Sequence, residues 1–163
     1  MPEQVETLVT PHMHERKGIW GNEQVSDPVS LSDIRKWAIA VYWPQTPPRL
    51  YWDEAYAKTT RWGGIIAPQD FNPFAWPIKF VDPTETSNGL RRPKGRRGMN
   101  GGQVDTYFAP MRPGDVIRAR HRLRDWNENK TRLGLTLFAY TETEWWNQNE
   151  QLVKRHVQTF IWY

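Results

Sequence analysis

Cysteine is absent from this sequence of 163 residues. Its absence excludes a disulfide framework, a zinc site with thiolate ligands and a cysteine nucleophile. The sequence also has no apolar run long enough to cross a bilayer, and its N-terminus lacks the basic and apolar regions of a secretory signal. We therefore expect a soluble, cytoplasmic protein that makes no membrane contact.

Tryptophan, in contrast, is abundant, with ten residues. The indole ring buries a large apolar area, so tryptophan suits cores, interfaces and wide ligand pockets. Packing in a core or an interface is the simpler explanation of this abundance. The chain length fits one domain, and 38% hydrophobic with 25% charged residues is ordinary for a globular protein.

The first half of the chain predicts helices. Ser30 is suited to cap a helix that continues until the proline at position 44. The apolar stripe of this helix consists of Leu31, Ile34, Trp37, Ala38 and Val41. A short helix is expected over residues 53–58. Another is expected over residues 68–77, where Pro73 shortens or bends it because an interior proline removes a hydrogen bond.

The second half of the chain predicts an antiparallel meander. Strand-like runs cover residues 103–108, 116–126, 133–145 and 151–163, and turn-forming residues separate them. A meander buries one face, and the helices before it are the obvious cover for that face. The sequence therefore predicts an α+β domain.

A basic segment separates the two halves. Residues 82–102 are rich in glycine, proline, serine, asparagine and arginine, which predicts a long flexible loop. Its cationic cluster consists of Arg91, Arg92, Lys94, Arg96 and Arg97. Such a cluster either attracts phosphate groups or is a solvated loop, and both interpretations stay open. A nucleic-acid partner is not expected, because the cluster is not joined to a recognised nucleic-acid-binding fold.

Four short motifs carry a resemblance to a known family. They are residues 50–57 (LYWDEAYA), 62–68 (WGGIIAP), 112–115 (RPGD) and 149–153 (NEQLV). In this order and spacing they resemble the N-terminal-type hot-dog domain of MaoC-like dehydratases and enoyl-CoA hydratases. The resemblance implies a single hot-dog fold of the α+β class, a curled antiparallel sheet wrapped around a central helix. This domain would cover residues 30–163, after an N-terminal leader of residues 1–29.

The resemblance also implies a function. Relatives add water to 2-enoyl thioesters, or remove it from 3-hydroxyacyl thioesters, with coenzyme A or acyl carrier protein as the handle and with no cofactor or metal. Backbone N–H groups at the helix start around residues 68–70 would stabilise the developing enolate oxygen. Substrate-binding residues are expected at Trp62, Gly64, Ile66, Gln69, Asp70, Arg91, Arg92, Lys94, Arg96 and Arg97.

The sequence departs from the family's catalytic pattern. Catalytic relatives carry Asp-x-Asn-Pro-x-His, and the matching positions here hold Thr46 instead of Asp and Tyr51 instead of His. Neither side chain takes up a proton readily near neutral pH. The resemblance therefore implies a catalytic hot-dog partner subunit, in a heterodimer or heterotetramer, that supplies the missing pair. This chain would then shape the acyl-thioester pocket of an (R)-type hydratase or dehydratase.

Two other interpretations stay open. The chain is a self-contained homodimeric enzyme with Asp70 or Tyr51 as its catalytic group, or it is a non-enzymatic module that binds an acyl thioester. Asp70 also has a simpler explanation, because an acidic residue in a first turn stabilises a helix.

The histidines are not expected to take part in chemistry. His12 and His14 fall in the leader, which we expect to be mobile. His121 and His156 fall in predicted strands, where a packed and hydrogen-bonded histidine is the expected form.

Overall fold

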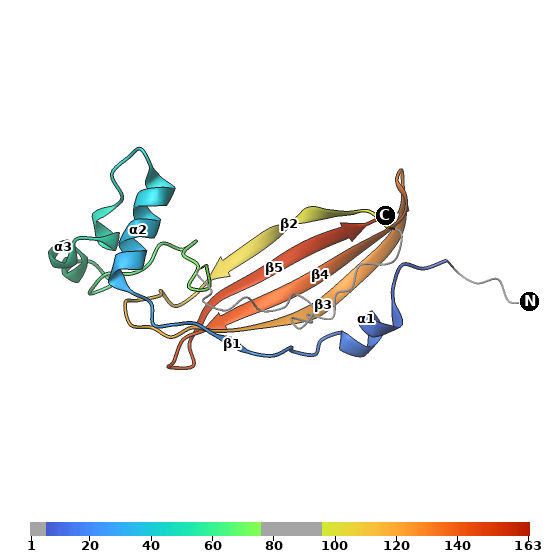
Figure 1. Ribbon diagram of the computed structural model, residues 1–163, viewed down its shortest axis with the longest axis horizontal. Coiled ribbons are helices and arrows are strands. Elements are labelled where there is room, and N and C mark those ends of the chain that lie inside the picture. The colour runs from blue at the N-terminus through green and yellow to red at the C-terminus, as the bar shows by residue number, and fades with distance from the viewer. Residues whose placement is uncertain (1–5, 76–95) are drawn as a thin grey trace, which may run out of the picture.

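A five-stranded antiparallel sheet forms most of the molecule (Figure 1). The structure, a computed structural model, describes residues 6–75 and 96–163. In chain order its elements are α1 (Pro11–Arg16), β1 (Gln24–Val25), α2 (Leu31–Tyr42), the 3-10 helix η1 (Arg49–Tyr51), α3 (Glu54–Thr59), β2 (Gly98–Tyr107), β3 (Arg118–Thr131), β4 (Gly134–Trp146) and β5 (Leu152–Trp162). The strand order β1-β3-β4-β5-β2 confirms the α+β class, and β3, β4 and β5 form the predicted meander. The strand before them, β2, pairs with β5 and not with β3, so the four predicted strands do not form one continuous meander.

Local capping explains where α2 and α3 begin. The Ser30 hydroxyl accepts a hydrogen bond from the backbone N–H of Asp33, and the Asp53 carboxylate accepts one from that of Tyr56, both at 3.0 Å. Each side chain satisfies an N–H group that the first helical turn leaves unpaired, so both predicted helix starts are confirmed. No helix in the described part of the chain is long and apolar enough to span a bilayer.

The helix predicted to begin at Pro68 is wrong over residues 68–75, which form turns and extended backbone. The side chain of Asn72 accepts a hydrogen bond from the backbone N–H of Phe74 at 2.9 Å. This contact folds the backbone around Pro73, which itself has no N–H to donate to a helix. Residues 76–77 lie outside the described part. Helical N–H donors for an enolate oxygen are therefore not found at residues 68–70.

The basic segment is partly strand. Residues 98–102, which we expected in the flexible loop, belong to β2, which pairs with β5. The pairing starts one residue earlier, because the backbone of Arg97 exchanges two hydrogen bonds with that of Tyr163 at 3.0 and 3.1 Å. Residues 82–95 lie outside the described part, and so do the predicted binding residues Arg91, Arg92 and Lys94.

Residues 6–29, which we expected to form a mobile leader, pack against the sheet. Helix α1 lies beside β3 (Figure 1), and its Met13 is fully buried together with Leu8. The backbone N–H of Gly18 donates to the carbonyl of Leu123 at 2.8 Å, and β1 extends the sheet beside β3. The expectation failed because the apolar side chains that anchor this segment are too few to give a periodic pattern.

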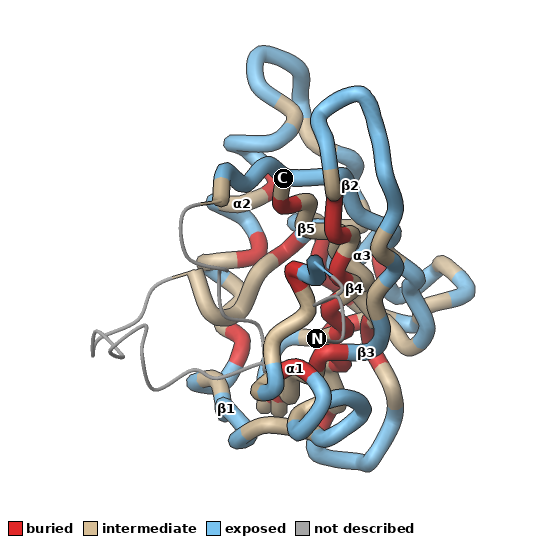
Figure 2. Tube along the Cα trace, turned by 90° about the vertical axis from the view of Figure 1, so that its right-hand side faces the viewer, coloured by how far each residue is buried: buried red, intermediate tan, exposed pale blue. Residues whose placement is uncertain are grey.

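The buried apolar side chains gather in two clusters, and the loops around them are mostly exposed (Figure 2). One cluster joins α2, α3 and residues 65–71 to the end of the sheet where β3 and β5 begin, through Ile117 and Val153. The other joins residues 8–13 to Leu137 and Ala139 of β4. Between the two clusters lies the part of the sheet that carries the candidate site.

The opposite face of the sheet, which we call the outer face, carries paired charges. Glu142 and Glu144 of β4 are nearly fully buried there, at 3% and 5% exposed. Arginines of β3 and β5 pair with them, including Arg120 with Glu144 at 2.8 Å and Arg122 with Glu142. Side chains alternate along β3, because Arg120 and Arg122 face outward whereas Ala119, His121 and Leu123 lie on the inner face.

Candidate functional site

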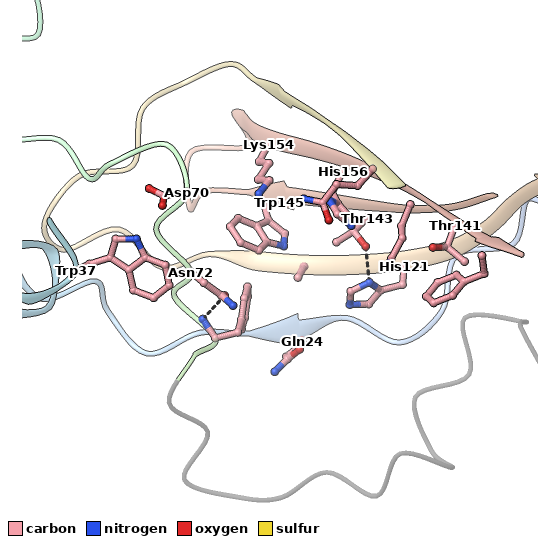
Figure 3. Close-up of a pocket in the computed structure, with 15 residues that line it drawn as sticks. Gln24, Trp37, Asp70, Asn72, His121, Thr141, Thr143, Trp145, Lys154 and His156 are labelled. Carbon is pink, nitrogen blue, oxygen red and sulfur yellow. Dashed lines mark hydrogen bonds between the residues drawn. The ribbon is translucent and has the colours of Figure 1, made fainter. Parts of the chain in front are cut away.

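A cavity of about 530 Å³ lies on the inner face of the sheet, between the sheet and the segments that precede it in the sequence (Figure 3). Its aromatic walls are Trp37, Phe74, Trp145 and Phe160. The remaining lining residues are mainly polar: Gln24, Asp70, Asn72, Gln103, Ala119, His121, Thr141, Thr143, Lys154, His156 and Gln158. This volume falls in the range of small-molecule sites, roughly 300–1,000 Å³.

A continuous row of polar residues crosses the floor of the cavity. The strand register aligns His121 of β3 with Thr143 of β4, Thr143 with His156 of β5, and His156 with Asp105 of β2. Aligned residues of neighbouring strands point to the same face of a sheet, so all four side chains share the inner face. We call these four residues the histidine row.

Hydrogen bonds join the histidine row in two pairs. The Nδ1 atom of His156 lies 2.6 Å from Oδ1 of Asp105, and the Nδ1 atom of His121 lies 2.7 Å from the hydroxyl oxygen of Thr143. Figure 3 shows His121, Thr143 and His156 together on the strands beside the cavity. Both histidines are hydrogen-bonded, as predicted, but both also line the cavity.

The charges of the row follow from burial and from these bonds. Burial raises the pKa of Asp105, but the hydrogen bond from His156 and the nearby Lys154 ammonium lower it more, so the net shift is downward and the carboxylate is ionised. Burial, followed by the neighbouring charge of His156, lowers the pKa of His121 from its usual 6.5. His121 is therefore held in its neutral form near neutral pH.

Lys154 places a buried cation next to this row. Only 9% of the residue is exposed, and its ammonium nitrogen lies 3.4 Å from Oδ2 of Asp105. The same nitrogen stands over the rings of Trp145 and Tyr107, at 5.0 and 5.3 Å from their centroids. A carboxylate and two aromatic faces compensate the charge, as a buried ammonium requires.

The residues predicted to bind substrate are spread over the structure. Asp70 lines the cavity, on the loop that carries Asn72 (Figure 3). Trp62 accepts a hydrogen bond from Arg112 at its backbone carbonyl, and Ile66 is buried in the core at 8% exposed. The other predicted positions in the described part that are not among the cavity residues are Gly64, Gln69, Arg96 and Arg97.

Arg96, one of the residues that we expected to bind phosphate, forms an ion pair with a carboxylate. Its guanidinium lies 2.9 Å from the carboxylate of Glu6. This pair joins the start of the described chain to the start of β2. The Glu6 carboxylate therefore neutralises at least part of the positive charge of Arg96 that we had assigned to phosphate recognition.

The two positions at which the resemblance leads us to expect the catalytic pair hold a threonine and a tyrosine. Thr46 is exposed, and Tyr51 is partly buried. Burial, a hydrogen bond with Tyr42 and the negative charge of Asp70 raise the pKa of Tyr51 to about 12. The phenol therefore stays protonated at neutral pH and cannot act there as a general base.

The described residues contain no group of three or more histidine, aspartate or glutamate side chains arranged to hold a metal ion. The chemistry that these side chains offer is hydrogen bonding and proton exchange within an aromatic cavity. Sequence analysis missed the histidine row because its members are ordinary strand residues whose alignment depends on the pairing register. Alternation alone could have placed His121 and His156 on the buried face.

Comparisons with known proteins agree with this architecture. A family model described as FAS1-like, dehydratase domain region, matches residues 16–156. The ChsH1-ChsH2 complex from Mycobacterium tuberculosis contains a chain that is 19% identical, with a TM-score of 0.72 over 92% of this chain and 88% of that chain. A comparison with curated proteins finds no match.

Two further solved structures share the fold. The MaoC-like dehydratase from Rhodospirillum rubrum is 17% identical, with a TM-score of 0.56 over 86% of this chain and 90% of that one. The HadBC (3R-hydroxyacyl-ACP dehydratase) complex from M. tuberculosis has a chain that is 15% identical, with a TM-score of 0.55 over 88% of this chain and 96% of that one. The predicted hot-dog fold, with its curled antiparallel sheet, is confirmed.

Proposed function

The chain belongs to the family of FAS1-like dehydratase domain regions, and from this membership we propose that it is a subunit of a heteromeric enoyl-thioester hydratase or 3-hydroxyacyl-thioester dehydratase. In this assembly the chain shapes the pocket for the acyl group. A partner hot-dog chain supplies the carboxylate and imidazole that move the proton. Coenzyme A or acyl carrier protein carries the substrate, and no cofactor is required.

The observation that carries this proposal is the chemistry at Thr46 and Tyr51. Hydration of a 2-enoyl thioester needs a group that takes a proton from water as the oxygen bonds to Cβ, and that returns a proton to Cα. A threonine hydroxyl and a phenol whose pKa is about 12 cannot do this near neutral pH. The cavity, in contrast, is large enough for a bulky acyl group.

The outer edge of β2 offers a surface for the partner. Within residues 6–75 and 96–163, β2 pairs with β5 alone, so its other edge has no strand beside it. Apolar side chains stand exposed along it, with Met99 at 42%, Val104 at 66% and Phe108 at 46%. An unpaired edge with apolar side chains is disposed to pair with another strand. Two of the similar structures are themselves complexes named for two components, ChsH1-ChsH2 and HadBC.

A co-expression experiment tests the proposal. The chain is purified alone and together with a neighbouring gene product that carries an intact Asp-x-Asn-Pro-x-His motif, and native mass and 2-enoyl-CoA hydration are measured on both samples. We expect a mixed complex that is active only when both chains are present. An active homodimer of this chain would contradict the proposal.

A matched pair of variants tests the role of the β2 edge. Val104→Lys places a charge on the exposed edge, and we expect it to weaken the mixed complex in native mass measurements. Leu133→Lys changes a residue of similar exposure, 48%, in the turn between β3 and β4, and should leave the complex intact. Equal effects of the two changes would show that β2 is not the contact surface.

One observation supports a second candidate, a self-contained hydratase. Asp70 lines the cavity and is the carboxylate that a homodimeric enzyme would use as its acid and base. This candidate predicts that the chain alone is active and that Asp70→Asn abolishes the activity. The same assay on the isolated chain therefore separates the two candidates.

A further inference from the structure

The histidine row is unusual because it places hydrogen-bonding groups in the middle of the inner face of the sheet. We propose that this row binds a hydroxyl group carried on the acyl moiety of the ligand. The inference rests on the proposed function, because it assumes that the cavity receives an acyl thioester. It adds a specificity site that lies apart from the positions of the usual catalytic pair.

The polar floor extends one step beyond the row. The next aligned positions on the same face are Thr141 of β4, Gln158 of β5 and Gln103 of β2, and all three line the cavity. A plain hydrocarbon chain over this floor would remove water from these groups without replacing its hydrogen bonds, which costs free energy for each group left unpaired. The floor therefore disfavours a simple fatty acyl chain and favours a ligand with a polar substituent.

The Asp105–His156 pair decides which polar substituent fits. The ionised carboxylate of Asp105 can only accept, so Nδ1 of His156 carries the hydrogen and donates it. The other ring nitrogen, Nε2, is left to meet a ligand, and it accepts from a hydroxyl when the imidazole is neutral and donates to a hydroxyl oxygen when the imidazole is protonated. A hydroxyl can both donate and accept, so it fits this position in either form of the ring, whereas a ketone or an ether can only accept.

The walls of the cavity indicate what carries this hydroxyl. Trp37 and Phe74 come from the segments before the sheet, and Trp145 and Phe160 come from β4 and β5. Phe74 packs edge-on against Trp145, with ring centroids 5.6 Å apart. Aromatic faces around a polar floor suit a flat or cyclic acyl group that is apolar on its sides and polar at one position. We therefore infer a ring-bearing, hydroxylated acyl group as the ligand class.

Calorimetric titration of the full chain with matched thioesters tests this inference. The probes are cinnamoyl-CoA and its ortho-, meta- and para-hydroxy derivatives, which are isomers of one another and each have one more oxygen atom than cinnamoyl-CoA. We expect at least one hydroxylated isomer to bind about tenfold more tightly than cinnamoyl-CoA, the effect of one good hydrogen bond.

Two variants assign that preference to the row. His156→Asn keeps an N–H that can donate to Asp105 but removes the nitrogen at the Nε2 position, and it should abolish the preference. Thr143→Val removes the neighbouring hydroxyl at nearly constant volume and should reduce the preference, which covers the case in which His156→Asn fails to fold. His14→Asn, on α1 and away from the cavity, is the matched control and should retain the full preference.

The outcomes separate this inference from the proposed function. If all four thioesters bind the wild-type chain equally, the hydroxyl site is wrong and thioester binding stands. If the preference survives in both variants, another part of the chain recognises the hydroxyl and the assignment to the row is wrong. If none of the four thioesters binds, the proposed acyl-thioester function fails, and the inference that rests on it fails too.

Discussion

At the scale of single residues, the inner face of the sheet places ionisable groups where water is scarce. His121 is the clearest case, because burial is the largest cause of its lowered pKa and the charge of His156 adds to it. Its partner, Thr143, is a hydroxyl that can donate or accept, so it supports the neutral ring in either tautomer. The histidine row thus keeps one imidazole neutral beside another that is bonded to a carboxylate.

The pH dependence of folding should reveal this neutral histidine. The pKa of His121 lies below 6.5 in the folded state, so as pH falls below that value the unfolded state takes up the proton first. The contribution of neutral His121 to the free energy of unfolding is therefore complete above the pKa that this histidine has in the unfolded chain. It is lost as pH falls from that value toward the lower pKa of the folded state. His121→Gln removes this titration and should flatten the fall in the free energy of unfolding between about pH 7 and pH 5, measured by urea denaturation. Identical slopes in the two proteins would contradict the assignment.

At the scale of elements, α2 connects a local signal to the cavity. Of its predicted apolar stripe, Ile34 and Ala38 are buried, whereas Val41 is 48% exposed because the end of the helix extends past the packed segment. Trp37 lines the cavity and packs edge-on against Phe71, with ring centroids 5.5 Å apart. The position of one cavity wall therefore depends on the stability of this helix.

Removing the cap of α2 should destabilise the protein measurably. Ser30→Ala leaves the N–H of Asp33 without its side-chain acceptor and should lower the free energy of unfolding by about 1 kcal/mol. Ser30→Asn keeps an acceptor at the same position and should stay close to wild type. Denaturant titration of the three proteins checks this, and an alanine variant as stable as wild type would show that the cap contributes little.

At the scale of the whole molecule, the sheet has apolar cover at both ends and polar residues between them. Helices α2 and α3 pack at one end, and residues 8–13 pack at the other. The segments that cover the two ends of the sheet come from the same third of the sequence, and the chain that joins them includes β1. The N-terminal segment is therefore a structural part of the domain, and it closes the end of the inner face beyond the cavity.

A core substitution in α1 should show that this segment supports the fold. Met13 is fully buried against the sheet, so Met13→Ala leaves a cavity and should cost about 2–5 kcal/mol of unfolding free energy. The exposed neighbour His14, changed to alanine, serves as the control and should cost much less. Thermal denaturation of both variants distinguishes the packed segment from a loosely attached leader, for which both changes would be nearly neutral.

Local chemistry in the sequence determined much of this protein. The helix starts at Ser30 and Asp53 and the strands of the second half, with the meander of β3, β4 and β5, could be predicted. Each depends on neighbours within a few positions or on the identity of one residue. The helix expected at Pro68 was wrong for a reason that is also local, because the Asn72 side chain and Pro73 together favour a turn over a helix.

Only the tertiary structure decided the candidate site. Asp105 and His156 are 51 positions apart, and His121 is 22 positions from Thr143, so no local pattern shows that they bond. Their alignment depends on strand register, which the packing of whole strands determines and which a shift of one residue would reverse. The burial of Met13 likewise depends on contacts with β4. The sequence specifies these long-range contacts, but they can be recognised only after the strands have paired.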